Sequence, residues 1–344
     1  MRAMVLNALG LLRDHPRPLE LCDLPDPVPA RNELLIQVSV CGVCHTELDE
    51  IEGRTPPPHL PIVLGHQAIG QVIAMGEEAG AFRVGDRVGV AWIYSACGTC
   101  PFCRSGRENL CEQFRATGRD ANGGYAELMT VPAAFAHPIP ATYRDVEAAP
   151  LLCAGAIGYR SLRLTGIKDG QLLGLVGFGA SAHLVLQLAR HQFPRTRIFV
   201  FARREGERVF ARDLGADWTG DIHDVVPERL DAIIDTTPAW TPVLAALASL
   251  APGGRLVINA IRKEDGDKDA LSALDYSAHL WREKEIKSVA NITRLDVAEF
   301  LSLAAEVPIR PEIHEYALVD ANRVLVELKE KQIRGAKVLR ISAP

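Results

Sequence analysis

The sequence lacks the features that would direct a chain to a membrane or to nucleic acid. It has no apolar run as long as a membrane span, and its first residues continue into Asn7, Asp14 and several prolines without a signal-peptide core. The formal net charge is only -5, so no excess of positive charge attracts nucleic acid or an anionic membrane surface. Repeats and blocks of like charge are also missing, and the short acidic cluster at 47–50 is expected to be a solvated face. We therefore expect a cytoplasmic protein with small-molecule partners.

Two domains are expected from the length and from a change of pattern along the chain. The 344 residues are too many for one ordinary core, and 48% of them are hydrophobic, which is enough to fill two. Before about residue 150, loops rich in Pro and Gly separate short β-type runs, which indicates a mainly β domain. These runs are 33–40, 70–75 and 86–92.

The pattern after about Ala148 predicts a parallel sheet. A helix is expected at 149–164, and strand-like runs then alternate with helical stretches, as in βαβ units. The expected strands are 172–176, 197–201, 232–235 and 255–260, and the expected helices are 182–191, 204–214 and 242–250. From about Ser288 we expect a strand at 288–292, a helix at 296–305 and a closing helix–strand pair that ends at 337–341.

Four of the eight cysteines fall within fifteen positions. Thiolates spaced this closely suit a closed tetrahedral zinc site that has no open position for a substrate. An iron–sulfur cluster or two disulfides are the alternatives, but a reducing compartment disfavours disulfides and nothing suggests an electron-transfer partner. We predict a structural zinc in the segment 95–113, bound by Cys97, Cys100, Cys103 and Cys111.

A second candidate metal site begins at Val40-Cys41-Gly42-Val43-Cys44-His45-Thr46-Glu47. A Cys-x-x-Cys that is followed by His and Thr offers soft ligands beside a hydroxyl that can pass a proton. A redox dithiol and two buried thiols are the alternative readings. Two residues farther along also have readings without a metal: His66 could be a loop histidine with its hydrogen bonds satisfied, and Cys153 could be a small buried apolar side chain. Together, Cys44, His66 and Cys153 would form a three-ligand zinc site with a fourth position open to water or substrate.

The segment after the expected strand 172–176 predicts a dinucleotide-binding loop of the form Gly-x-Gly-x-x-Ala. Gly177 permits the tight turn, Gly179 lets the pyrophosphate approach the backbone, and Ala182 keeps the helix close to the strand. A register that uses Gly174 would put the loop inside the apolar strand, so we reject it.

The residues after the next strand bear on the choice of nucleotide. About twenty residues after Ala182, where an acid would bind the ribose of NAD, the sequence reads Phe201-Ala202-Arg203-Arg204. Arg203 and Arg204 could bind a 2′-phosphate, which favours NADP over NAD by a small margin. The alternative is that both arginines are only the solvated start of a helix.

Taken together, these motifs resemble the zinc-dependent alcohol dehydrogenases of the medium-chain dehydrogenase/reductase superfamily, in a bacterial branch, over nearly the full length. The resemblance rests on 41–46, 65–66, 97–111, 120–127, 153–155, 177–182, 280–281 and 288–291. It implies an α/β protein with a GroES-like, mainly β catalytic domain at 1–152 and 289–344 and a doubly wound Rossmann domain at 153–288. It further implies two zinc ions per chain and a homotetramer or homodimer.

The resemblance also implies roles for single residues. Cys44, and not Cys41, is the zinc ligand at the first motif, with His66 and Cys153 as its partners. Thr46 contacts the substrate alcohol and accepts its proton, and hydride passes to the nicotinamide. Trp92 and Ile93 are expected in the substrate pocket.

Three positions depart from the family pattern. Gln67 replaces the glutamate that usually follows the ligand histidine and can approach the zinc. Asp49 replaces the histidine that ends the proton relay, so it is a candidate carboxylate acceptor, with water as the alternative. Glu47 replaces the aspartate that orients the ligand histidine.

The expected activity is the interconversion of alcohols and aldehydes or ketones with NAD(P)(H). A polyol or aromatic-alcohol dehydrogenase of the same superfamily is an alternative. A non-enzymatic NADPH-binding relative that has lost the catalytic zinc is another, which the retained Cys44, His66 and Cys153 disfavour.

Overall fold

The structure is a computed structural model that describes residues 1–307, 309–330 and 335–342. It divides the chain into two compact units. Unit 1 comprises Met1–Cys153, Ile292–Glu306 and Arg310–Pro344, and unit 2 comprises Ala154–Asn291 and Val307–Ile309. Within the described residues, no helix combines the length and apolar character needed to cross a membrane.

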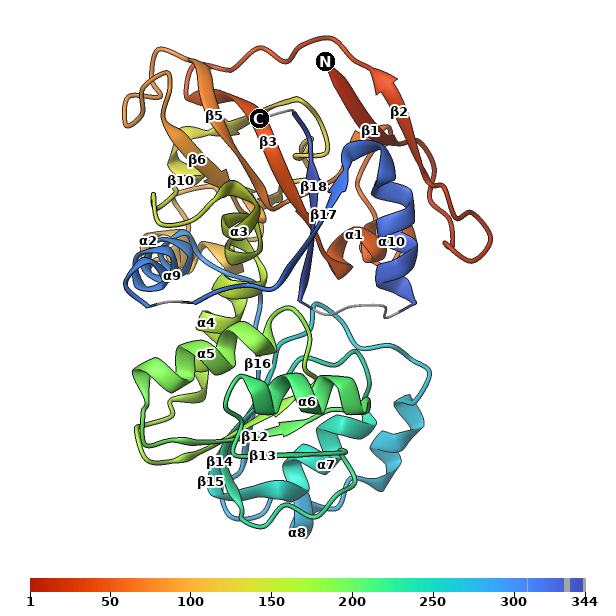
Figure 1. Cartoon of the computed structure of the whole chain (residues 1–344), viewed down its shortest axis with the longest axis vertical. Coiled ribbons are helices and arrows are strands. Elements are labelled where there is room, and N and C mark those ends of the chain that lie inside the picture. Colours follow the sequence, from red (N-terminus) through yellow and green to blue (C-terminus); the bar gives the residue numbers. More distant parts are fainter. Residues whose placement is uncertain (308, 331–334, 343–344) are drawn as a thin grey trace. The chain divides into compact units, whose positions relative to one another are not determined.

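Unit 1 is built around a seven-stranded sheet. Its strand order is β10-β6-β5-β3-β18-β17, and β9 also pairs with β3. The strands are β3 (Glu33–Val43), β5 (Ala68–Met75), β6 (Arg87–Val90), β9 (Leu128–Pro132), β10 (Ala136–Pro138), β17 (Ile313–Ala317) and β18 (Ala336–Arg340). Because β18 runs antiparallel to β3, the last part of the chain lies in the same sheet as the first (Figure 1).

The smaller elements of unit 1 surround this sheet. A three-stranded sheet has the order β2-β1-β4, and β7 pairs with β8. These strands are β1 (Arg2–Leu6), β2 (Leu19–Asp23), β4 (Ile62–Val63), β7 (Ile93–Ser95) and β8 (Arg115–Ala116). The helices are α1 (His45–Ile51), α2 (Pro101–Arg104), α3 (Asp145–Ala148), α9 (Arg294–Glu306) and α10 (Ala321–Lys329). Short 3-10 helices are η1 (Glu108–Leu110), η2 (Ala133–Phe135), η3 (Ala149–Leu152) and η5 (Leu318–Asp320).

The alternation of side chains along β3 fixes which of its faces enters the core of unit 1. Leu34, Ile36 and Val38 are fully buried, whereas Gln37 between them is exposed. This period of two is the pattern of a strand with one face on the core. The register of β3 is therefore fixed, and so is the position of its C-terminal end. That end leads directly into the candidate site.

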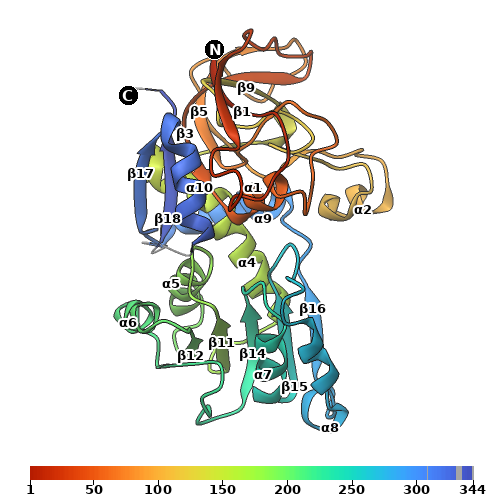
Figure 2. The ribbon, with the colours of Figure 1, turned by 90° about the vertical axis from the view of Figure 1, so that its right-hand side faces the viewer.

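Unit 2 is a parallel six-stranded sheet with helices between its strands. The strand order is β13-β12-β11-β14-β15-β16, and all five pairings are parallel (Figure 2). The strands are β11 (Leu172–Val176), β12 (Arg197–Phe201), β13 (Trp218–Gly220), β14 (Leu230–Asp235), β15 (Leu250–Ile258) and β16 (Glu285–Ser288). The helices are α4 (Ala154–Thr165), α5 (Ala182–Gln192), α6 (Glu205–Asp213), α7 (Thr241–Ser249), α8 (Tyr276–His279) and the 3-10 helix η4 (Lys268–Ala273).

The strand order of unit 2 reverses between β11 and β14. From β11 the chain moves outward through β12 to β13, and it then returns to β14 on the other side of β11. In open parallel sheets, ligands bind at the carboxyl ends of the strands where the order reverses. The predicted α/β fold class with a doubly wound parallel sheet is confirmed.

Two predicted elements are wrong in their bounds. The helix expected at 149–164 is interrupted at Cys153, whose φ of -125° and ψ of -77° lie outside the helical region. Its apolar small residues suit a continuous helix, so the sequence did not reveal the break. The strand expected at 288–292 is instead β16, which ends at Ser288, and Asn291 has a φ of 57° that no strand tolerates. All four residues of β16 are exposed, so no hydrophobic pattern marked it.

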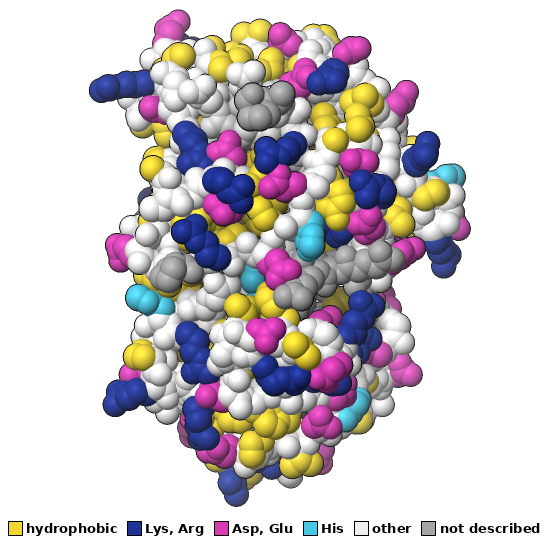
Figure 3. All heavy atoms as spheres, in the orientation of Figure 1, with side chains coloured by type: hydrophobic (Ala, Val, Ile, Leu, Met, Phe, Trp, Pro, Cys, Tyr) yellow, Lys and Arg dark blue, Asp and Glu magenta, His cyan; other side chains and the backbone are white. Residues whose placement is uncertain are grey.

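The expected solvated face at 47–50 is also wrong. Glu47, Asp49 and Glu50 are all buried in α1. Elsewhere the surface mixes charges of both signs, as Figure 3 shows for one face.

Candidate functional site

The end of β3 and the segment before β5 bring two of the predicted ligands together. Cys41 pairs with Ala68 across the two strands, and the Gly42 N–H donates to the Gln67 carbonyl at 3.0 Å. Cys44 follows β3 in an extended conformation and caps α1, where its N–H donates to Glu47 Oε2 at 2.7 Å. This hydrogen bond satisfies a free N–H group at the helix start and ties Glu47 to the backbone of Cys44.

Cys153 completes the group from a distant part of the chain. It lies at the break between η3 and α4, and its Sγ is 3.9 Å from Cys44 Sγ and 3.2 Å from His66 Nε2. The three ligand atoms all lie within 4.8 Å of one another. Cys41 is not in this group and is fully buried. The structure therefore groups Cys44, and not Cys41, with His66 and Cys153.

The carboxylate of Glu47 orients the His66 ring. His66 Nδ1 lies 2.6 Å from Glu47 Oε1, and both side chains are buried. Burial by itself would lower the pKa of His66, but the charge of Glu47 and hydrogen bonds to Cys44 and Glu47 raise it well above its usual value. With Nδ1 held by a carboxylate, Nε2 faces the two sulfurs, which is the usual arrangement of a metal-binding histidine.

The two sulfurs differ in their affinity for a proton. The hydrogen bond from Cys153 lowers the pKa of Cys44 well below its ordinary value, and the same bond raises the pKa of Cys153. Of the two thiols, Cys44 therefore gives up its proton more readily, and Cys153 keeps its proton more tightly. A divalent cation bound at this site would displace that proton.

The expected proton-transfer residues are both on α1. Thr46 is half-buried, and its Oγ1 lies 3.7 Å from Cys44 Sγ. The Asp49 carboxylate is 7% exposed, and its Oδ1 accepts a hydrogen bond from Arg54 Nε at 2.5 Å. The hydroxyl of Thr46 thus lies beside the ligand group, whereas Asp49 is held in an ion pair.

Gln67 lies against the backbone of β3. Its side chain is 4% exposed, and a Cβ placed on Gly42 would lie only 2.7 Å from its Oε1. Only glycine at position 42 leaves room for this side chain.

The sequence analysis missed two buried polar groups near the site. Neither carboxylate oxygen of Glu50 has a hydrogen-bond partner, and neither does the hydroxyl of Tyr125. Glu50 follows Glu47 by three residues on α1, and this spacing was the only signal that could have placed both on one side of the helix.

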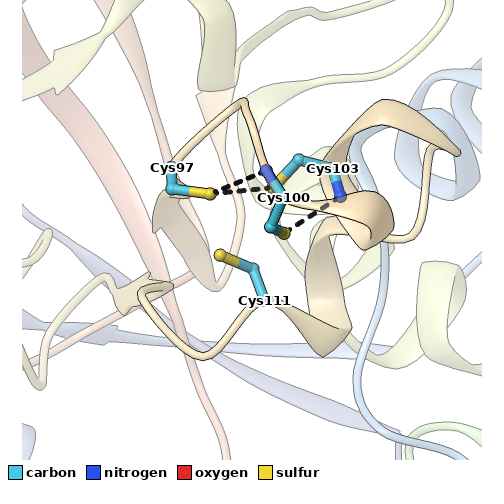
Figure 4. Close-up of side chains that lie close together, drawn as sticks. All are labelled: Cys97, Cys100, Cys103 and Cys111. Carbon is cyan, nitrogen blue, oxygen red and sulfur yellow. Dashed lines mark hydrogen bonds between the residues drawn. The ribbon is translucent and has the colours of Figure 1, made fainter.

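The four-cysteine segment forms a compact group of its own. The ligand atoms of Cys97, Cys100, Cys103 and Cys111 lie within 4.8 Å of one another, and Figure 4 shows the four side chains converging. The Cys100 N–H donates to Cys97 Sγ at 3.3 Å, and the Cys103 N–H donates to Cys100 Sγ at 3.4 Å. Hydrogen bonds from the backbone of Thr99 and Cys100 lower the pKa of Cys97 to about 6. All eight cysteines of the chain are free.

An ion pair between a buried carboxylate and a partly exposed arginine anchors this segment to α9. Glu108, the first residue of η1, is 2% exposed. Its Oε1 accepts hydrogen bonds from the backbone N–H of Arg294 at 2.8 Å and from Arg294 Nε at 3.1 Å. The cysteine lobe, defined as residues 95–113, is therefore fixed to the start of a helix that lies far away in the sequence.

The predicted nucleotide loop has the expected strand–turn–helix form. Gly177 follows β11 with a φ of 80°, and a Cβ there would meet Thr236 Oγ1 at 2.8 Å. A Cβ on Gly179 would meet nothing within 4 Å, so its backbone is open to a ligand, and Ala182 is buried at the start of α5. The loop lies at the carboxyl end of β11, at the point where the strand order reverses.

The residues after β12 are basic and exposed. Arg203 and Arg204 precede α6, and both side chains are exposed. The backbone N–H of Arg204 points to Glu207 Oε2 at 3.5 Å. Residues 201–204 contain no acid that could accept hydrogen bonds from a ribose.

Comparisons with known proteins agree on one family. Residues 30–141 match the family model of the alcohol dehydrogenase GroES-like domain. A Mycobacterium tuberculosis protein named "Probable alcohol dehydrogenase AdhA" is 46% identical over 329 residues, which cover 94% of this chain and 93% of the relative. An alcohol dehydrogenase of Geobacillus stearothermophilus is 30% identical over 351 residues, 99% of both chains. The solved structure of an NAD-dependent alcohol dehydrogenase aligns with a TM-score of 0.88 at 25% identity and covers 99% of this chain and 100% of its own.

The similarity extends over both units and is not confined to the GroES-like region. The predicted GroES-like, mainly β domain and the predicted family are therefore confirmed. The chain belongs to the zinc-dependent alcohol dehydrogenases of the medium-chain dehydrogenase/reductase superfamily, which are NAD(P)-dependent oxidoreductases.

Proposed function

We propose that this protein interconverts an alcohol and its aldehyde or ketone at the Cys44–His66–Cys153 centre, with NAD(P)(H) as the hydride carrier. One observation supports this most directly. Three soft ligands from three separate segments converge within 4.8 Å, and a threonine hydroxyl lies 3.7 Å from one of the sulfurs. A set of three protein ligands leaves a position open for substrate, as a catalytic zinc requires.

The donor set fits a zinc ion. Two thiols and one imidazole are ligands that Zn²⁺ prefers, and the low proton affinity of Cys44 prepares a thiolate for it. When bound, zinc supplies a Lewis acid for the substrate oxygen, and the nicotinamide accepts or donates the hydride.

The residues of the chain supply orientation and proton transfer. Glu47 holds Nδ1 of His66 and so keeps Nε2 directed at the ligand group. Thr46 Oγ1 accepts the proton of the substrate hydroxyl in the oxidation direction while its own hydroxyl proton passes on, and the relay runs in reverse in the reduction direction. From Thr46 the proton passes to water rather than to Asp49, because Arg54 Nε already donates a hydrogen bond to Asp49 Oδ1 and holds this side chain in an ion pair.

The nucleotide-binding residues are Gly177, Gly179 and Ala182, with a small preference for NADP. Gly179 has open space around it where the pyrophosphate would lie, so the loop fits a dinucleotide. Exposed Arg203 and Arg204 follow β12 at the place where a 2′-phosphate is recognised. We expect Arg203→Asp to raise the KM for NADP by about tenfold and to leave the KM for NAD within about twofold. Equal changes in both KM values would contradict the NADP assignment.

A second, structural zinc is proposed for the cysteine lobe. Four thiols fill a tetrahedral set, so no position remains for a substrate. Eight free cysteines suit a reducing compartment such as the cytoplasm, and we propose that the protein forms a homodimer or homotetramer there.

The proposed function is tested by metal analysis together with a substrate panel. We expect two zinc ions per chain, and we expect primary or simple secondary alcohols to be oxidised with NADP or NAD in a side-by-side assay. Polyols and aromatic alcohols belong in the same panel, because a strong preference for either would assign the alternative substrate class. One zinc per chain, together with nucleotide binding but no turnover, would instead identify a nucleotide-binding protein without catalysis.

A further inference from the structure

Glu50 is a buried carboxyl that the proposed mechanism does not use. It lies on α1, and its side chain is 1% exposed. Both of its oxygens lack a hydrogen-bond partner. The other acids of this helix and of the following turn are all engaged: Glu47 with His66, Asp49 with Arg54, and Glu52 with Lys329.

An unpartnered buried carboxyl is costly to the fold. Removing an ionised carboxylate from water without a partner costs several kcal/mol, and even the neutral acid leaves a donor and acceptors unsatisfied. Native proteins satisfy most such groups, so an exception indicates a missing partner. A partner of positive charge would offset the cost.

The surroundings of Glu50 indicate where that partner lies. Glu50 is one helical turn beyond Glu47, so both side chains leave α1 on the same side, toward the ligand group. Burial raises the pKa of Glu50 and the charges of Glu47 and Cys44 raise it further, whereas the charges of His66 and Arg119 oppose them. Two residues of the candidate metal centre therefore act on this carboxyl.

A second unsatisfied group belongs to the same cluster. The hydroxyl of Tyr125 is fully buried and has no partner, and the charges of Glu47, Cys44 and Glu50 act on it. The ring of Tyr125 packs on Gly65, directly before His66, since a Cβ on Gly65 would lie 2.4 Å from it. Two unsatisfied polar groups beside one ligand set are what a bound cation and its ordered water would satisfy.

The position next to His66 carries no charge in this chain. The residue there is Gln67, whose amide lies against Gly42 and cannot supply a negative charge. We propose that Glu50 is a positioning residue of the metal centre, whose buried carboxylate stabilises the cation bound by Cys44, His66 and Cys153 in place of a carboxylate at position 67. This inference rests on the proposed function, because it requires a metal at that centre.

A purely structural role predicts a different outcome. If Glu50 only fills space, Glu50→Gln keeps its shape and removes a costly buried acid, so it stabilises the fold and leaves the metal unaffected. If Glu50 stabilises the cation, the same variant stabilises the metal-free protein but loses metal faster. Metal retention therefore separates the two roles, and activity alone does not.

The test measures zinc release from the purified holoenzyme to a chromophoric chelator. The group of Cys44, His66 and Cys153 is called the open centre below. We expect zinc release from the open centre to be about tenfold faster in Glu50→Gln than in the natural protein, as for other changes to residues that support metal ligands. Release from the cysteine lobe serves as the internal control and stays unchanged. Adding Gln67→Glu to Glu50→Gln returns a carboxylate to the centre, and we expect it to restore slow release.

Two results would overturn this inference. Release from the open centre within about twofold of the natural rate would leave Glu50 with a packing role only. Faster release that Gln67→Glu does not restore would assign the effect to packing rather than to charge. Neither result would affect the proposed function, which fails only if the natural protein has no zinc at the open centre or does not turn over alcohols.

Discussion

The two cysteine-containing groups of unit 1 are both compact but are built in opposite ways. In each group the ligand atoms lie within 4.8 Å of one another. The cysteine lobe takes all four ligands from one short segment, whereas the open centre joins Cys44 to Cys153 across 109 residues. The open centre also has a buried carboxylate, Glu47, hydrogen-bonded to its histidine.

This difference indicates what each group of ligands can contribute to the protein. The four thiols of the lobe form a full set of metal ligands within one short segment. The Glu108–Arg294 ion pair attaches this segment to α9. A set of three ligands from distant segments depends on the whole of unit 1, and it leaves a position for substrate. Under the proposed function, the lobe would contribute stability and the centre formed by Cys44, His66 and Cys153 would contribute the chemistry.

The largest expected effect comes from removing a ligand of the open centre. We expect Cys153→Ala to lower kcat/KM for alcohol oxidation by at least about a thousandfold, because the Lewis acid is lost. The zinc content should fall from two per chain to one. Cys22→Ala is the matched control, since Cys22 lies outside both groups. Full activity of Cys153→Ala would remove this centre from catalysis.

Removing a ligand of the cysteine lobe should lower stability and leave activity nearly unchanged. We expect Cys100→Ala to lower the free energy of unfolding by at least about 3 kcal/mol, because a structural metal contributes directly to folding. Activity per folded molecule should stay within about twofold, measured at a temperature where both proteins are folded. A loss of activity as large as that of Cys153→Ala would show that the two groups are not separate in function.

A smaller effect is the expected loss of stability at low pH through His137, on which the charges of Arg294 and Glu108, the ion pair that anchors the lobe, both act. His137, on β10, is 6% exposed, and burial followed by the charge of Arg294 lowers its pKa to about 4. The unfolded chain binds a proton near pH 6.5, but the folded protein does not until about pH 4. Stability is thus fully present above about pH 6.5 and falls as the pH drops toward 4, by up to about 3 kcal/mol in total.

Replacing this histidine tests the acid effect. We expect His137→Leu to lose less stability than the natural protein between pH 7 and pH 4.5, as measured by denaturant unfolding at each pH. The exposed His15→Leu is the control. If the pH dependence of His137→Leu equals that of the natural protein, another group is responsible.

Local features were predictable from the sequence, and contacts between distant residues were not. The spacing of Cys97 to Cys111 and the strands at 172–176 and 197–201 depend on neighbouring residues, and the structure reproduces them. The grouping of Cys44 with Cys153 came from the family resemblance, because no local pattern joins residues so far apart.

The errors have physical reasons. Polarity predicted an exposed acidic cluster in α1, but Glu47 and Glu50 are buried, and Glu47 is hydrogen-bonded to His66, a contact between segments that no local pattern reveals. The break at Cys153 follows η3, which packs against β3, β6 and α9, elements that helix propensity does not reveal. Strand β16 is an exposed edge strand without an apolar face.

The separation of the ligands along the chain also bears on the order in which metal binds during folding. Cys97 and Cys111 are 14 residues apart, whereas Cys44 and Cys153 are 109 apart. Closing the longer loop costs roughly 2 kcal/mol more in chain entropy. We therefore expect the lobe to bind zinc while most of unit 1 is still unfolded, and the open centre to bind zinc only after β3, β5 and η3 have assembled. A newly made chain would be metallated before it becomes active.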